Sequence, residues 1–117
     1  MSWRENLNVG NLNLENLMSQ TKTRHTADGL IDPKKMVQIL DGSSVALSME
    51  MTPEDDRFYM LACVDASNAV TVTLQGSWTF DGSSNVATFS AGDGLIALAD
   101  EANDMLILLS NNGVVLS

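Results

Sequence analysis

The chain has 117 residues, which is enough for one folded domain and too few for two independent cores. Hydrophobic residues make up 44% of it and charged residues 18%, a balance that favours a packed interior over a disordered chain. Fifteen acidic against six basic residues give a net charge of −9, which argues against a nucleic-acid or anionic-membrane surface because phosphate groups would be repelled.

A single cysteine and a single histidine exclude an intramolecular disulfide and a zinc cluster built from these residues. No apolar run is long enough to cross a membrane, and the first fifteen residues lack the apolar segment of a signal peptide. The sequence therefore predicts a soluble chain that is not exported.

Residues 1–32 are predicted to form an extended N-terminal arm and a linker. Between Asn6 and Leu17 apolar residues alternate with Asn and Glu, and Gly10 interrupts any helical pattern. A lone strand cannot bury such residues, so they need a surface of the body or of a neighbouring subunit; a frayed terminus is the alternative. The polar linker holds His25, which we expect to be solvated. The candidate partner-binding residues are Trp3, Arg4, Leu7, Val9, Leu12, Leu14, Leu17, Lys22 and Arg24.

Residues 33–41 fit two structures. Asp32 before Pro33 is a good start for a short helix, with Gly42 as its end. Val37 and Ile39 alternate as they would in a strand, and a strand is our preferred interpretation.

After Gly42 the pattern is consistently that of β-strands. Alternating apolar residues predict half-buried strands at 45–51 and 70–74, and turn signals recur about every eight to twelve residues. The segments 78–80 and 86–89 flank a turn at 81–85 and predict a hairpin. More continuous apolar runs are typical of strands covered on both faces or used in a subunit contact; these are residues 58–64, 95–99 and 105–109. The fold class predicted for residues 33–117 is all-β, an antiparallel β-sandwich or small barrel.

The chemistry-bearing residues do not combine into a known catalytic or metal site. Cys63 lies in an apolar run, where a thiolate is disfavoured. Asp81, Ser83 and Asn85 alternate like calcium ligands, but the Gly and Glu of an EF-hand loop are missing. The Asp-Gly-Ser-Ser sequence occurs at 41–44 and again at 81–84, which we interpret as turn chemistry used twice. We predict no enzyme, no metal and no cofactor.

The charges are segregated along the chain. All six basic residues precede residue 58, whereas the six charged residues beyond it are acidic. A cationic and apolar arm beside an anionic body favours association between like subunits or with an acidic lattice.

Two blocks of sequence resemble a known class of proteins. Residues 52–74 contain an acidic turn, an apolar strand, a small-residue turn and a Val-Thr-Val-Thr-Leu strand; residues 86–117 contain a Gly/Asp turn, apolar strands and a final Asn-Gly turn. This arrangement resembles small β-rich virion proteins of tailed phages, which include capsid decoration (cement) proteins and fibre-type modules. The likeness covers about residues 45–117 and implies a structural role without catalytic residues. Leu106-Ile107-Leu108 departs from the aromatic residue that such proteins often carry there, and the arm has no counterpart.

We therefore expect a virion structural protein: a capsid decoration protein, made in the host cytoplasm, that binds the outer surface of a phage head. The expected partners are the major capsid protein and further copies of the chain, with a homotrimer favoured; nucleic acid and membrane are not expected. The alternative is a fibre-type or carbohydrate-recognition β module that presents Trp78, Tyr59 or the loop 81–85 to a ligand.

Overall fold

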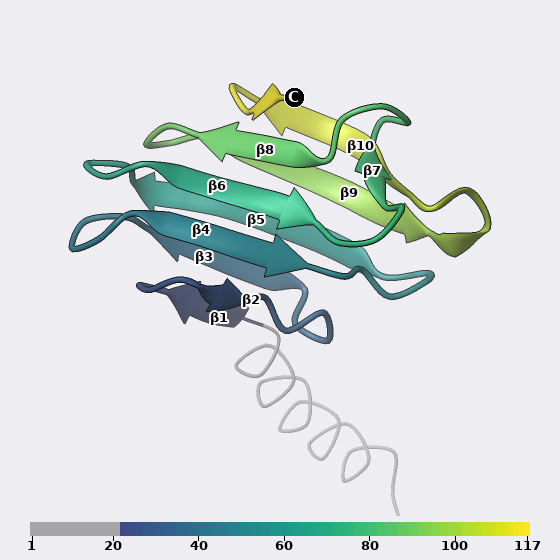
Figure 1. The fold of residues 1–117 in the computed structure, drawn as a ribbon, viewed down its shortest axis with the longest axis horizontal. Coiled ribbons are helices and arrows are strands. Elements are labelled where there is room, and N and C mark those ends of the chain that lie inside the picture. The colour runs from purple at the N-terminus through teal and green to yellow at the C-terminus, as the bar shows by residue number, and fades with distance from the viewer. Residues whose placement is uncertain (1–21) are drawn as a thin grey trace, which may run out of the picture.

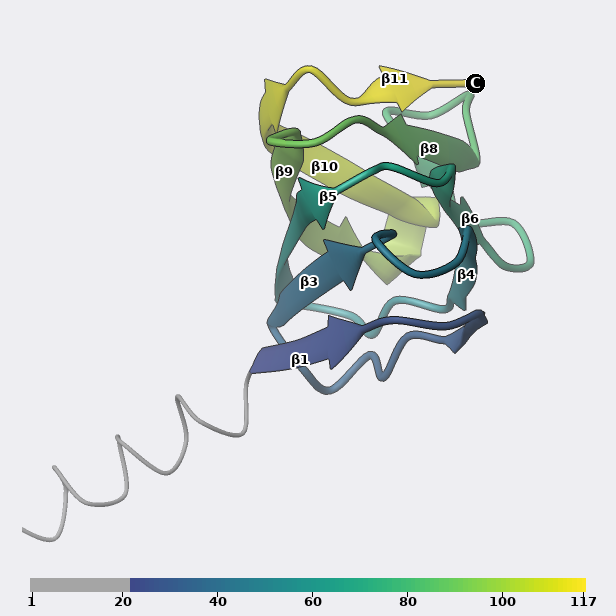
Figure 2. The same cartoon turned by 90° about the vertical axis from the view of Figure 1, so that its left-hand side faces the viewer.

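Two β-sheets enclose the hydrophobic core of residues 22–117, the part of the chain that this computed structural model describes (Figures 1 and 2). Sheet A contains, in spatial order, β1 (Lys22–His25), β3 (Val37–Asp41), β5 (Phe58–Asp65), β9 (Gly94–Asp100), β10 (Met105–Asn112) and β7 (Thr79–Phe80). Sheet B contains β11 (Val115–Leu116), β8 (Val86–Phe89), β6 (Val70–Leu74), β4 (Leu47–Met51) and β2 (Gly29–Leu30). A 3₁₀ turn, η1 (Glu101–Asn103), joins β9 to β10.

The first six strands wind like a solenoid. The chain alternates between the sheets, so that β1, β3 and β5 lie parallel in sheet A while β2, β4 and β6 lie parallel in sheet B. Val37 lies beside Met60, and Leu47 lies beside Val70, the same offset of 23 residues in both sheets. Figure 1 shows the consequence: the coils stack in chain order, from purple at β1 toward green.

Beyond β6 the pairing becomes antiparallel. β8 pairs with β6, β9 with β5, β10 with β9 and β11 with β8, all antiparallel, while β7 lies parallel to β10 at the edge. The all-β class is confirmed, but the sheets are mixed, and the expected antiparallel arrangement occurs only in the C-terminal part. Alternation along a strand fixes which face is buried, and it leaves the choice of neighbour open.

The hairpin predicted for residues 78–89 is wrong. β7 lies in sheet A and β8 in sheet B, so the loop 81–85 crosses from one sheet to the other. A short turn rich in Gly, Ser and Asn suits either connection, because such residues specify a chain reversal and not the sheet that receives the next strand.

Part of the expected linker belongs to the body. Residues 22–30 contain β1 and β2 at the first edges of the two sheets, and Ile31 is buried in the core. The Ile31 amide donates a hydrogen bond to the Glu50 carbonyl at 2.8 Å. Edge strands expose many polar side chains, which explains why this segment has the composition of a linker.

Residues 37–41 form a strand, as preferred from the sequence. The helix-like signal before it comes from a turn, in which the Asp32 side chain accepts a hydrogen bond from the Lys34 amide at 2.9 Å. The largest fully buried side chains point between the sheets and include Tyr59, Phe80, Leu40, Leu47 and Met49.

Candidate interaction surface

The outer face of sheet A is apolar across its central strands. Residues of β3, β5, β9 and β10 alternate between the core and this face, and cross-strand register places their outward side chains beside one another. Val37, Met60 and Ile96 form one row, and Phe58, Leu98 and Ile107 form a second row. We define the outer face of sheet A by Val37, Ile39, Phe58, Met60, Ala62, Val64, Ile96, Leu98, Met105 and Ile107.

Several of these side chains are open to solvent. Phe58 is 50% exposed, Val64 48% and Met60 38%, although none of these side chains has a polar group that would favour contact with water. Ala62 lies directly opposite Gly94, and these two small residues help to line a hollow of about 270 Å³ bordered by Met60, Ile96, Ser110 and Asn112. An apolar sheet face with a hollow in it is typical of a surface that another protein covers.

The outer face of sheet B is polar. Its central strands present Ser48, Glu50, Thr71, Thr73 and Thr88, with apolar residues toward the two edges: Leu30 in β2, and Val86 and Val115 toward β11. The two sheets share one core, and their outer faces differ in composition. Thr and Ser suit water on a strand surface, whereas the apolar set of sheet A suits a protein partner.

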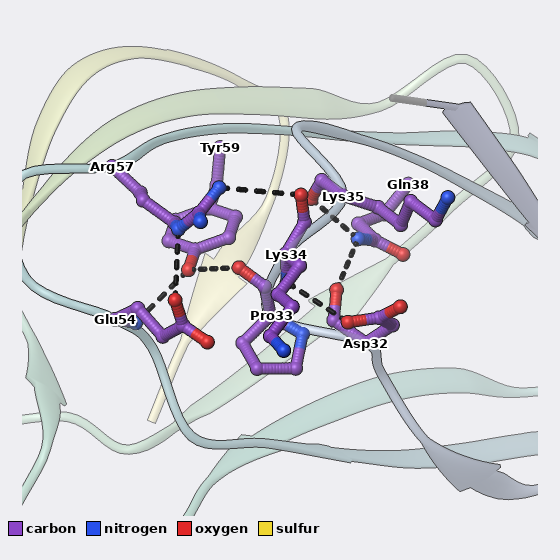
Figure 3. Close-up of polar contacts among 8 residues, drawn as sticks. All are labelled: Asp32, Pro33, Lys34, Lys35, Gln38, Glu54, Arg57 and Tyr59. Carbon is purple, nitrogen blue, oxygen red and sulfur yellow. Dashed lines mark hydrogen bonds and ion pairs between the residues drawn. The ribbon is translucent and has the colours of Figure 1, made fainter. Parts of the chain in front are cut away.

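Two buried polar side chains hold the connections at one end of the sheets. Gln38 is fully buried; its amide nitrogen donates to the Lys35 carbonyl at 2.8 Å and to the Asp32 carbonyl at 3.1 Å (Figure 3). Its amide oxygen lies 2.6 Å from Nε2 of His25, and since that oxygen only accepts, His25 carries a proton on Nε2. The expected solvated His25 is therefore tied to the interior.

Tyr59 makes the second link. Its hydroxyl donates to the Pro33 carbonyl at 2.6 Å and accepts from the Glu54 amide at 2.9 Å, and Figure 3 shows it between these two connections. It thereby joins the β2–β3 connection to the β4–β5 connection. Within residues 22–117 every buried side-chain nitrogen or oxygen has a hydrogen-bond partner. These groups are used to hold the fold together.

Neither the thiol nor the acidic residues form a reactive centre in the described part of the chain. Burial raises the pKa of the Cys63 thiol, which favours the unreactive protonated form, and the thiol donates to the Asp65 carbonyl. Among residues 22–117 no three His, Cys, Asp or Glu side chains are arranged to hold a metal ion.

The candidate partner-binding residues of the arm fall into two groups. Trp3, Arg4, Leu7, Val9, Leu12, Leu14 and Leu17 lie outside the described residues. Lys22 and Arg24 lie in β1, at the edge of sheet A, and both are exposed. Arg24 forms an ion pair with Asp41 at 2.9 Å, and hydrogen bonds from Ser43 and Arg24 lower the pKa of Asp41.

The aromatic residues proposed for glycan binding are not accessible. Trp78 is 8% exposed and Tyr59 is fully buried, so neither can stack on a sugar ring. Only the loop 81–85 of that alternative remains at the surface. The outer face of sheet A was not among the candidate sites, although the continuous apolar runs at 58–64, 95–99 and 105–109 were its signal.

The buried hydroxyl of Tyr59 predicts a loss of stability at alkaline pH. Burial raises the pKa of Tyr59, so the folded chain disfavours the charged phenolate. Its contribution to the free energy of unfolding is fully present below the ordinary tyrosine pKa of about 10 and is lost as the pH rises through the raised pKa. Because the chain has one tyrosine, the ultraviolet absorbance of tyrosinate reports this residue alone.

We expect an absorbance midpoint above the ordinary value, together with loss of the fold. Tyr59→Phe removes a donor from the Pro33 carbonyl and an acceptor from the Glu54 amide, which costs about 1–3 kcal/mol at neutral pH. The variant should lose the tyrosine part of the alkaline transition. Titration at the midpoint of free tyrosine in a chain that stays folded would contradict this account.

No protein-family model matches the chain, and no curated protein matches it either. Within residues 22–117 no helix has the length and hydrophobicity needed to cross a bilayer.

Proposed function

We propose that this chain is a virion structural protein, a capsid decoration protein that binds the outer surface of a phage head as a small homo-oligomer. The observation that carries the proposal is the contrast between the apolar outer face of sheet A and the polar outer face of sheet B. A decoration protein needs one surface for protein contacts and another for water. The two-sheet body supplies both without any moving part.

In this proposal the arm attaches the body to the major capsid protein. Its apolar residues alternate with Asn and Glu, so an extended arm could place Leu12 and Leu14 on one side of a strand laid on the shell. The arm ends at β1, on the edge of sheet A. Each leucine that the shell buries contributes about 1.5–3 kcal/mol, which offsets the cost of ordering the arm on binding.

Labelling of intact virions tests the location. An antibody raised against the body should mark heads in particles purified from a host that carries the gene. A chain without residues 1–21 should keep the circular dichroism of the full chain and bind empty heads at least about tenfold more weakly, since the buried leucines are gone. Unlabelled virions would contradict the proposal, and unchanged binding by the truncated chain would exclude the arm.

A fibre-type module is the second candidate. The parallel coils β1–β2, β3–β4 and β5–β6 stack along one axis, as repeats do in elongated proteins. Antibody label on tail fibres instead of heads would favour this candidate.

A further inference from the structure

We infer that the outer face of sheet A binds a second copy of this chain, with the β1 side of one copy against the β9–β10–β7 side of the other. The inference names the partner of that face and rests on the homo-oligomer in the proposed function. It begins from the exposed apolar rows that contain Met60 and Phe58, which no other described element covers. Burial of these rows is the favourable term in association.

Charge is the argument for a second copy and for its orientation. The coils stack in chain order, so the segregation of charge along the sequence becomes a segregation across the sheet. Residues 22–57 hold five basic and seven acidic residues, whereas residues 58–117 hold six acidic residues and no basic one. The basic residues on the β1 side are Lys22 and Arg24 in β1 and Lys34 and Lys35 in the β2–β3 connection, whereas Arg57 precedes the central strand β5 and pairs with Glu54.

The acidic side lies around β7 and the β9–β10 connection. Asp100 ends β9, Glu101 begins η1, Asp104 precedes β10 and Asp81 follows β7. A copy turned so that its β1 side meets this region brings Lys34 toward Glu101. The opposite orientation would bring the two acidic regions together, and like charges at an interface are strongly unfavourable.

The apolar part of the face is smaller than a stable interface, so the charged edges of the sheet must also be buried in the contact. With strands about 4.8 Å apart and residues rising about 3.3 Å, the apolar strands β3, β5, β9 and β10 cover roughly 440 Å² of sheet. A stable pair of proteins buries about 800 Å² on each partner. The contact must therefore extend to the edge strands, which gives an apolar centre with a charged rim, the usual composition of a protein interface.

Native mass spectrometry of the purified full-length chain over a range of concentrations tests the inference. The wild-type chain should form dimers or larger closed assemblies. Ile96→Asp places a charge at the centre of the face and should raise the dissociation constant by at least about 100-fold, because a buried unpaired carboxylate is costly. The matched control is Thr88→Asp on the outer face of sheet B, which should assemble like the wild type.

Exchanging charges across the rim tests the orientation. Lys34→Glu and Glu101→Lys should each weaken assembly about two- to fivefold, the range for exposed ion pairs, and the double variant should recover the wild-type value.

Three results would overturn the inference: a monomer at every concentration, normal assembly by Ile96→Asp, or assembly that is lost only when residues 1–21 are removed. Val64→Asp, at a position 48% exposed on the same face, replaces Ile96→Asp if that chain does not fold. The proposed function has separate readouts. A monomeric chain that still labels virions would defeat the inference and the homo-oligomer but leave the virion location intact, and an assembling chain absent from virions would defeat only the location.

Discussion

Replacing Gln38 by glutamate is expected to lower the free energy of unfolding by about 3–5 kcal/mol at neutral pH, the cost of an uncompensated buried charge. The Gln38 amide is fully buried and donates to the carbonyls of Lys35 and Asp32. A carboxylate has no hydrogen to donate, so both carbonyl oxygens would face a negative charge. The single ring nitrogen of His25 that reaches this site cannot compensate for the loss of two donors.

The dependence of this penalty on pH identifies its cause. Desolvation favours the neutral form of a buried carboxyl group, so the penalty is complete above the raised folded-state pKa and shrinks as the pH falls toward the unfolded value. Urea titrations at a series of pH values should show the wild-type and Gln38→Glu curves converging in acid. Thr88→Glu, on the polar face of sheet B, should cost less than about 0.5 kcal/mol at any of these pH values. Equal effects of the two substitutions would contradict the role assigned to Gln38.

The positions of most strands could be predicted from sequence because strand alternation is a local property. The pattern at 70–74, for example, alternates apolar residues with threonine, and β6 has the expected bounds and the expected buried face. The partner of a strand is a property of the whole chain. Val37 has no local feature that selects a parallel neighbour at Met60 over an antiparallel one, and the predicted sheets were antiparallel for that reason.

The turns that follow β3 and β5 repeat one another in sequence and in structure, and they belong to successive coils. The Asp-Gly-Ser-Ser sequence at 41–44 and 81–84 occurs in two turns that do not occupy equivalent positions in the coils. The structural equivalent of Asp41 is Asp65, which lies beside it in the next coil. Each accepts a hydrogen bond from the amide two residues later, that of Ser43 at 3.1 Å and that of Ser67 at 2.8 Å. The similarity between these two turns covers only a few residues, which is too short to distinguish a structural repeat from a chance match in the sequence.

The candidate surface could be predicted only in part. The apolar runs at 58–64, 95–99 and 105–109 indicated strands that are covered on both faces or used in a subunit contact. The structure shows that these strands lie side by side as β5, β9 and β10 with one face uncovered by the described chain. That adjacency depends on long-range pairing that no local pattern contains.

Gly42→Ala is expected to destabilise the chain by about 1–3 kcal/mol, through overpacking at a site whose backbone cannot move away. A Cβ atom at this position would lie 2.7 Å from Cγ2 of Val70 and 2.9 Å from the Asn68 carbonyl oxygen. The glycine is held on both sides: its amide donates to the Asp65 carbonyl at 2.7 Å, and its carbonyl accepts from the Asn68 amide at 3.0 Å. The second coil thus packs on the third at this corner, and only a hydrogen atom fits there.

Gly29→Ala is the matched control, because a Cβ atom on this β2 residue would meet nothing within 4 Å. It should be neutral or slightly stabilising, since alanine has less backbone freedom to lose on folding. Thermal and urea unfolding of both variants distinguish the effect of close packing from the general effect of glycine replacement. Equal stability of the two variants would mean that the backbone at Gly42 can shift to make room for a methyl group. The parallel coils would then be held together mainly by their core side chains, and less by the backbone hydrogen bonds between Gly42 and the β5–β6 coil.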